Sequence, residues 1–311
     1  MKDRLKLLSI LVVGVISMAS ASIVIRFAQG QGAPSLVIAA YRLGTASLVL
    51  SIPALFQQAW QDYVTLSRHE FGMLVLSSIL LGLHFSAWIT SLAYSSVATS
   101  VVLVTTTPLW IGLAAPVLLD ERISPLAWIG MLGAIAGGSL MAVSDLSQGQ
   151  GNSAALGGLL SLLAAIAMAG YLIIGRGVRS RIRLISYLWF VYSGAAAFLL
   201  ALAVGSRHPL TGYPLSTTGL MVFLGLVPQL VGHTAANYAV RQLPAAIVSI
   251  ATLGEPVSAT ILAAIFLKEQ PQHLQLVGGV IVLCGILIAT LPTKQTAHVP
   301  RRRPKANSRR A

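Results

Sequence analysis

The sequence predicts an all-α polytopic membrane protein with ten transmembrane helices, arranged as two inverted five-helix repeats. Three observations lead to this fold class: the composition, the alternation of basic residues along the chain, and an internal repeat. Of the 311 residues, 56% are apolar and 9% are charged, and the mean hydropathy is +0.81. Soluble domains carry about 25% charged residues. The composition therefore excludes an ordinary soluble enzyme, a disordered protein and a disulfide scaffold.

Apolar stretches separated by short polar gaps supply the expected helices. A helix crosses the hydrocarbon core in about 20 residues, and it satisfies its own backbone groups, as lipid requires. The sequence has no series of segments that alternate between apolar and polar residues, so a transmembrane barrel is not expected. The expected spans are residues 6–28, 34–56, 70–93, 97–118, 125–144, 154–176, 184–205, 216–240, 244–267 and 272–292.

The first expected span imitates a secretory signal, because a basic start is followed by an apolar run and by Ala19-Ser20-Ala21. However, the apolar character continues through Ile23-Val24-Ile25, beyond the length of a typical signal core. We therefore expect this segment to be retained as a span. Arg26 lies near its outer end, and its side chain is expected to snorkel toward the membrane surface.

The basic residues indicate the orientation of the chain. With a cytoplasmic N-terminus, 17 of the 21 basic residues fall in cytoplasmic segments, and only Arg207 and Lys268 fall outside. Such an excess follows the positive-inside rule. An odd number of spans would place the basic N-terminus and the basic C-terminal tail on opposite sides. We therefore expect a protein of the cytoplasmic membrane with both termini in the cytoplasm.

A shift of 148 residues aligns positions 97–137 with 245–285 without a gap. The matches include Pro108 with Pro256, Glu121 with Glu269, Gly130 with Gly278, and Gly137 with Gly285. Because five spans per half is an odd number, the halves enter the membrane in opposite orientations, as in transporters with a site at the bilayer midplane. The predicted domains are a first repeat (1–144), an extracytoplasmic linker (145–153), a second repeat (154–292) and a disordered cytoplasmic tail (293–311).

The motifs within these halves resemble those of EamA-type carriers in the drug/metabolite transporter superfamily. The resemblance rests on Ala93-Tyr94, Ala98, Pro108-Leu109-Trp110 and Asp120-Glu121-Arg122-Ile123-Ser124, on their counterparts Ala245-Ala246, Glu255-Pro256-Val257 and Lys268-Glu269-Gln270, and on Arg42 within Ala40-Tyr41-Arg42-Leu43. It covers about residues 6–292. It implies a ten-helix fold that moves small metabolites, often outward and often amino acids or related compounds. The first-span glutamate of the distant small multidrug carriers has no counterpart here, and the basic tail lies outside the family pattern.

Glu255 is the acidic residue expected deepest inside a span. An ionised carboxylate in hydrocarbon is costly, so this side chain is expected to face a wet cavity, to be paired or to be protonated. It either takes part in proton coupling or binds a substrate amino group, or else it is a structural partner for Arg42 or for a helix end. Arg42 in turn is expected to pair with backbone carbonyls, a substrate carboxylate or Glu255.

Other candidate pocket residues follow helical spacing. Residues separated by four positions lie on one helix face, and such a polar face is expected to point into the protein. The candidates are Gln229, His233 and Asn237 in one span and His84 and Trp88 in another. They either line a pocket or form hydrogen bonds between helices. Trp110 and Tyr171 are candidates for an aromatic wall, with core packing as the alternative. Pro108 and Pro256 are expected to kink or break their helices beside the cavity.

No cofactor, metal ligand set or catalytic residue is predicted. Cys284 is the single cysteine, and motifs such as HExxH or GxSxG are absent from the spans. The tail from Lys294 is expected to lie near anionic lipid rather than to bind nucleic acid. Glycines 130, 133, 137, 278, 279 and 285 permit close helix contact, within one chain or in a dimer, and the oligomeric state stays open.

The sequence thus predicts a secondary transporter, not an enzyme. Its expected activity is export of a small metabolite, an amino acid or related compound, by alternating access, and proton coupling is an open option. The expected partners are a small-molecule substrate and the lipid bilayer. Two alternatives remain: a sugar, sugar-phosphate or nucleotide-sugar carrier of the same superfamily, and a membrane protein of assembly or channel type that is not a carrier.

Overall fold

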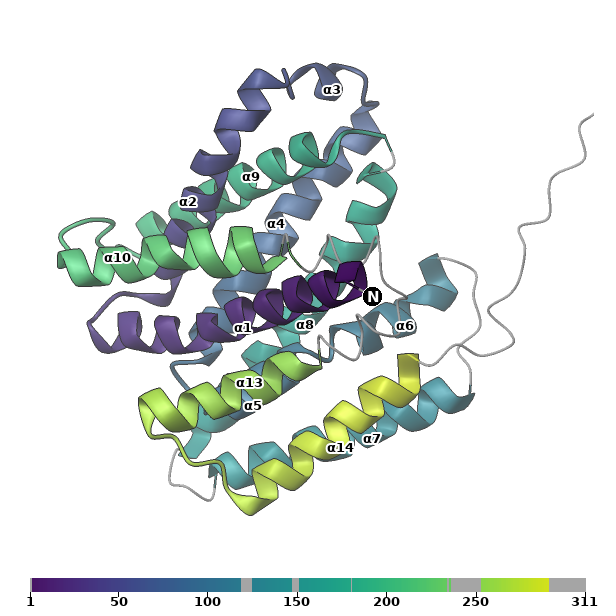
Figure 1. Cartoon of the computed structure of the whole chain (residues 1–311), viewed down its shortest axis with the longest axis vertical. Coiled ribbons are helices and arrows are strands. Elements are labelled where there is room, and N and C mark those ends of the chain that lie inside the picture. Colours follow the sequence, from purple (N-terminus) through teal and green to yellow (C-terminus); the bar gives the residue numbers. More distant parts are fainter. Residues whose placement is uncertain are drawn as a thin grey trace, which may run out of the picture.

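The structure is a computed structural model that describes residues 2–118, 125–146, 151–179, 181–233, 235 and 253–290. Within these ranges the regular structure is helical, and no strand occurs. The first half contains α1 (Lys2–Gly30), α2 (Ser35–Phe56), α3 (Gln61–Val64), α4 (Arg68–Ser91), α5 (Val97–Val104), α6 (Thr107–Leu118) and α7 (Pro125–Asp145). The second half contains α8 (Gly151–Arg179), α9 (Leu184–Gly205), α10 (Leu215–Leu224), η2 (Gly225–Gly232), α13 (Gly254–Leu262), η3 (Ala263–Leu267) and α14 (His273–Thr290). Figure 1 shows the whole arrangement.

Eight helical stretches among the described residues are long and apolar enough to cross a membrane. They are Ser9–Gly30, Ser35–Phe56, Arg68–Ser91, Val97–Ala114, Pro125–Asp145, Ala154–Gly175, Leu184–Gly205 and Leu215–Gly232. Two shorter apolar stretches, Gly254–Leu267 and His273–Ala289, lie where the ninth and tenth spans are expected. The described part of the chain is therefore that of a helical membrane protein, and the count of ten spans stays a prediction. The expected tail lies outside the described residues.

The fourth expected span is interrupted in its middle. α5 ends at Val104 and α6 begins at Thr107, so Pro108 lies in the first turn of α6. Its repeat counterpart Pro256 likewise lies in the first turn of α13. A proline is tolerated there because the first-turn N–H groups of a helix have no intrahelical partner.

The helices pack in a way that follows the internal repeat. α2 contacts α9, and α7 contacts α14, so each of these helices meets its own repeat counterpart. α4 contacts α8 in the same way that their repeat counterparts, α10 with η2 and α1, contact each other. Likewise, α1 contacts α13, and their counterparts, α8 and the pair α5 and α6, are also in contact. Exchanging the two halves therefore maps these contacts onto one another, as expected when a two-fold axis relates the repeats.

Matched glycines form the seam between α7 and α14. A Cβ on Gly137 would lie 2.5 Å from the carbonyl oxygen of Gly278, and one on Gly285 would lie 2.5 Å from that of Gly130. The repeat matches Gly130 with Gly278 and Gly137 with Gly285. The contact of Gly137 with Gly278 therefore has its repeat equivalent in the contact of Gly285 with Gly130. Such close approach is possible only without a side chain. The structure uses these glycines for packing within the chain.

Candidate functional site

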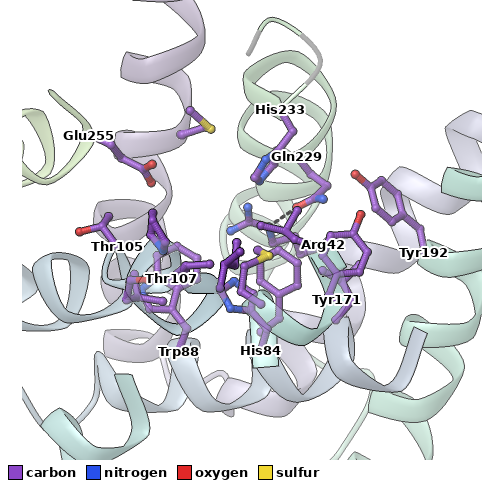
Figure 2. Close-up of a pocket in the computed structure, with 18 of the residues that line it drawn as sticks. Arg42, His84, Trp88, Thr105, Thr107, Tyr171, Tyr192, Gln229, His233 and Glu255 are labelled. Carbon is purple, nitrogen blue, oxygen red and sulfur yellow. Dashed lines mark hydrogen bonds between the residues drawn. The ribbon is translucent and has the colours of Figure 1, made fainter. Parts of the chain in front are cut away.

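A cavity of about 430 Å³ lies between the two halves of the protein. Figure 2 shows the side chains that enter it from several helices. The lining includes Arg42, His84 and Trp88 from the first half and Tyr171, Tyr192, Gln229, His233 and Glu255 from the second. Sites that bind small molecules measure about 300–1,000 Å³ and combine apolar walls with a few polar groups. The cavity has both properties.

Arg42 is the central cation of the cavity, and only 2% of the residue is exposed. Its Nε donates a hydrogen bond of 2.9 Å to Oε1 of Gln229. The guanidinium lies over the rings of Phe85 and Trp88, with its Cζ 4.4 and 5.5 Å from their centroids. Nη1 is buried and has no hydrogen-bond partner among the residues that the structure describes. The cation is held firmly in place, yet part of its donor capacity is unused.

The π-helical turn η2 brings Gln229 to Arg42. A Cβ on Gly225 would lie 2.7 Å from the carbonyl oxygen of Arg42, so glycine at this position allows η2 to approach α2 closely. Pro228 lies inside the turn and cannot donate a backbone hydrogen bond. Wide π-turns of this kind are frequent at functional sites.

α4 supplies two further polar aromatic side chains. It begins with a capping box, in which Ser67 and Glu70 satisfy each other's backbone N–H groups. Further along, Nδ1 of His84 lies 2.9 Å from the carbonyl oxygen of Ala164 on α8. Trp88 stacks on His84 with ring centroids 6.2 Å apart. Nε1 of Trp88 is buried without a hydrogen-bond partner in the described part of the chain, so the cavity contains a second unused donor.

Glu255 enters the cavity from α13, and Figure 2 shows its carboxylate on the other side of the view from Tyr171 and Tyr192. The described residues contain three ion pairs, and neither Glu255 nor Arg42 takes part in any of them. The structure thus does not pair Glu255 with Arg42, which was one of the interpretations open at the level of sequence. The cavity thus contains a guanidinium and a carboxyl group that form no ion pair with each other.

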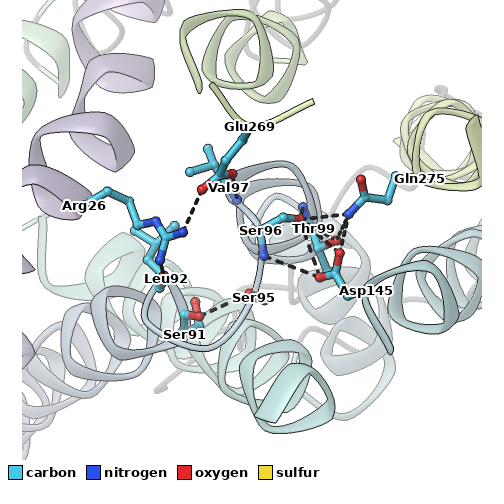
Figure 3. Close-up of polar contacts among 10 residues, drawn as sticks. All are labelled: Arg26, Ser91, Leu92, Ser95, Ser96, Val97, Thr99, Asp145, Glu269 and Gln275. Atoms are coloured by element: carbon cyan, nitrogen blue, oxygen red, sulfur yellow. Dashed lines mark hydrogen bonds and ion pairs between the residues drawn. The ribbon is translucent and has the colours of Figure 1, made fainter. Parts of the chain in front are cut away.

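A second polar region joins the halves away from the cavity, and Figure 3 shows its contacts. We define this inter-repeat cluster as Arg26, Ser96, Val97 and Asp145 from the first half with Glu269 and Gln275 from the second. Arg26 binds Oε1 of Glu269 at 2.7 Å and also donates to the carbonyl oxygen of Leu92. Arg26 thus binds a carboxylate of the other half, and its expected reach toward the membrane surface stays a prediction.

The same cluster continues from α5 to α7 and α14. The backbone N–H of Val97 donates to Oε2 of Glu269 at 3.0 Å. Nε2 of Gln275 donates to Asp145 and to Oγ of Ser96, the latter at 3.0 Å, and Ser96 donates in turn to Asp145. Asp145 is 1% exposed. The contacts from Glu269 and Gln275 cross from one half to the other, so this cluster fixes the relative position of the halves.

Comparison with known proteins identifies the family. The model of the EamA-like transporter family matches residues 5–143 and again residues 155–291. The chain belongs to the EamA-like transporter family. The resemblance noted in the sequence motifs is thereby confirmed, and the family indicates transport across a membrane.

Curated relatives of this EamA-like protein are also transporters by name. It is 28% identical over 208 residues to a probable terminal-alkyne amino-acid exporter of Streptantibioticus cattleyicolor, covering 66% of this chain and 69% of that protein. It is 24% identical over 189 residues to the uncharacterized transporter YdfC of Bacillus subtilis, covering 61% of each chain. An uncharacterized transporter of Clostridium kluyveri is 23% identical, over 77% of this chain and 78% of that one.

A solved crystal structure shares the fold of this EamA-like chain. The two agree with a TM-score of 0.62 at 18% sequence identity, over 91% of this chain and 96% of the other. At this identity the likeness concerns the fold alone.

Most candidate residues of the EamA-like chain come together in the cavity, whose lining contains Arg42, His84, Trp88, Pro108, Tyr171, Gln229, His233 and Glu255. Two candidates stand apart. Trp110 is not part of the lining, and its Nε1 donates to Oγ1 of Thr106 at 3.2 Å. Pro256 follows Glu255 in α13 and is buried, but it does not line the cavity. Asn237 lies outside the described residues.

Several lining residues were not singled out in the sequence. They include Met18, Phe85, Thr105, Thr107, Met168 and Tyr192. The two threonines lie at the helix interruption just before Pro108. The proline, which predicts a break beside the cavity, could therefore have pointed to both threonines as lining residues. Phe85 and Tyr192 belong to apolar runs in which every position looks equivalent, and nothing in the local sequence marks them.

Proposed function

We propose that this EamA-like protein exports a small amino acid or a closely related compound across the cytoplasmic membrane by alternating access. The observation that supports this most directly is the cavity, which is lined from both halves and whose described lining presents the guanidinium of Arg42 and the carboxyl group of Glu255 among aromatic side chains. A zwitterion with an apolar side chain matches that distribution. The relative from Streptantibioticus cattleyicolor, named a probable amino-acid exporter, supports the same substrate class.

The proposed topology has ten spans and cytoplasmic termini, with the two repeats inverted about the midplane. The distribution of basic residues supports this orientation. Motion of one half against the other would expose the cavity alternately to each side. Glu255 is the proposed proton carrier, because its carboxylate lines the cavity and has no ion-pair partner among the described residues. A basic tail close to anionic lipid completes the proposal.

A sugar-phosphate or nucleotide-sugar carrier is the weaker candidate. A phosphate carries up to two negative charges, and its recognition calls for several cations. Within the described part of the cavity lining, Arg42 is the one arginine or lysine, and Glu255 would repel the phosphate. A single arginine fits a single carboxylate better.

The test is counterflow in proteoliposomes that contain the purified protein. Vesicles are loaded with unlabelled L-leucine or L-propargylglycine, and the entry of the labelled compound is followed. Saturable accumulation that protein-free vesicles do not show is the expected result. A trapped pH indicator in the same vesicles should report proton movement in step with transport. Absence of counterflow for all common amino acids would refute the amino-acid class, and glucose 6-phosphate tests the weaker candidate.

A further inference from the structure

Two buried hydrogen-bond donors in the cavity have no partner among the residues that the structure describes, and both belong to the first half of the chain. They are Nη1 of Arg42 and Nε1 of Trp88. The guanidinium of Arg42 lies 5.5 Å from the centroid of the Trp88 ring, so the two side chains are neighbours. Arg42 is 2% exposed and Trp88 5% exposed. Buried donors in proteins are nearly always paired, and these two therefore call for an acceptor that the described residues do not supply.

We infer that Arg42 and Trp88 form the subsite for a carboxylate group of the substrate. This inference rests on the proposed transport of amino acids and specifies which end of the molecule binds where. A carboxylate offers two acceptor oxygens and one negative charge, which matches one cationic and one neutral donor side by side. Glu255 lies on another wall of the same cavity, where it faces the amino end.

The surroundings hold the arginine ready for this role. Its Nε is bound to Gln229, so the guanidinium cannot turn freely, and the faces of Phe85 and Trp88 support its charge by cation–π contact. Gln229 is a positioning residue, because it acts through Arg42. With Nε engaged, the Nη1 side of the planar fork is left for the ligand. A lysine could supply the charge but not this fork geometry.

The test compares ligands that differ only at the carboxylate. Binding to the full-length protein in detergent is measured by calorimetry for L-leucine, L-leucinamide, L-propargylglycine and its amide, and 4-methylpentanoate. A site built for an acceptor rejects an analogue that lacks it, so each amide is expected to bind at least about 100-fold more weakly than its acid. Equal affinities of acid and amide would overturn the inference.

Variants separate recognition from folding. Arg42→Gln should weaken L-leucine binding about 100-fold and leave the amide nearly unaffected, so that the acid-to-amide ratio falls toward one. Arg42→Lys should recover part of that ratio. Trp88→Phe keeps the ring and removes only the N–H donor, and should reduce the ratio several-fold. The matched control is Arg181→Gln, at a side chain that is 70% exposed, which should leave the ratio unchanged. A ratio that stays unaltered in both Trp88→Phe and folded Arg42→Gln would overturn the subsite.

The outcomes distinguish this inference from the proposed function. Binding of 4-methylpentanoate without any amino acid would uphold the carboxylate subsite and refute amino-acid transport. If neither the monocarboxylate nor any amino acid binds, the subsite itself is refuted. Inorganic phosphate serves as a competitor, and displacement of L-leucine by phosphate at lower concentration than by 4-methylpentanoate would assign the donors to phosphate instead.

Discussion

The cavity and the inter-repeat cluster contain the same kinds of polar group, but they differ in whether these groups have hydrogen-bond or ion-pair partners. In the cluster, Arg26 is paired with Glu269 and Asp145 accepts from Gln275. In the cavity, Arg42 and Trp88 each keep a buried donor that has no partner in the described part of the chain. An unsatisfied buried group costs about 1–3 kcal/mol. A fold that satisfies one region and leaves this cost in the other reserves the second region for a ligand.

The charged side chains of the cluster stabilise the structure, whereas those of the cavity are available to bind a ligand. The contacts of the cluster cross between the repeats, so they hold the two halves together in this structure. The cavity lining also comes from both halves, but its charges are held apart. Removing a charge should therefore affect stability in the cluster and transport in the cavity.

The largest effect on transport is expected when a glutamate is replaced by glutamine, and the same replacement can be made in the cavity and in the inter-repeat cluster. Glu255→Gln should lower transport on the order of 100-fold, about 3 kcal/mol, because a charged contact with the substrate or a coupling proton is lost. Its melting temperature should stay equal or rise, since a buried charge is removed. Glu269→Gln should lower the melting temperature and keep measurable transport. Counterflow in proteoliposomes and thermal unfolding in detergent are measured for both variants.

The same two variants can also contradict the view that the cavity carboxylate serves transport and the cluster carboxylate serves stability. Normal transport by Glu255→Gln would remove Glu255 from the mechanism. A loss of stability in Glu255→Gln as large as in Glu269→Gln would show that both carboxylates are structural. Glu255→Asp, which retains the acid, should restore part of the transport if the carboxylate takes part in it.

The next effect concerns the seam that continues from the cluster along α7 and α14. Gly137→Ala places a Cβ 2.5 Å from the Gly278 carbonyl oxygen, which forces the helices apart and should cost about 1–3 kcal/mol. Gly133→Ala is the matched control in the same helix, because its Cβ would meet nothing closer than 4.0 Å. Thermal unfolding should separate the two variants clearly. Equal melting temperatures of the two variants would show that α7 and α14 can move apart without a loss of stability.

The sequence was sufficient for the helical fold, the repeat and most of the cavity, for identifiable reasons. Apolar runs and matched residues at a shift of 148 positions are local or periodic signals, and rare polar residues such as Arg42 and Glu255 stand out in hydrocarbon. The sequence was insufficient wherever the partner was distant in the chain. The ion pair of Arg26 with Glu269 was not predicted, because the two residues lie 243 positions apart. The π-turn at Pro228 likewise depends on tertiary packing.

A smaller effect is expected from the ion pair within the cluster. The side chains of Arg26 and Glu269 are 30% and 23% exposed, so solvent screens their attraction, and a coupling free energy of about 1 kcal/mol is expected. A double-mutant cycle with Arg26→Gln and Glu269→Gln isolates it from the separate contacts to Leu92 and Val97. Additive changes in the free energy of unfolding would mean that the pair itself contributes nothing.

The smallest effect should come from a satisfied pair at the surface, between Asp62 on α3 and Arg183 before α9. Hydrogen bonds from Arg183 lower the pKa of Asp62 from 3.8 to about 2. Because the folded pKa is lowered, the stabilisation is fully present above the ordinary pKa and disappears as the pH falls toward 2. Asp62→Asn should therefore lower the melting temperature equally from pH 7 to about pH 5, and the difference from the unmodified protein should shrink below about pH 4. A difference that keeps its full size down to pH 2 would assign the effect to the hydrogen bond from Ser186 at 2.6 Å rather than to charge. This pair also joins the two halves, so a shift as large as that of Glu269→Gln would show that the inter-repeat cluster is not the stronger link between them.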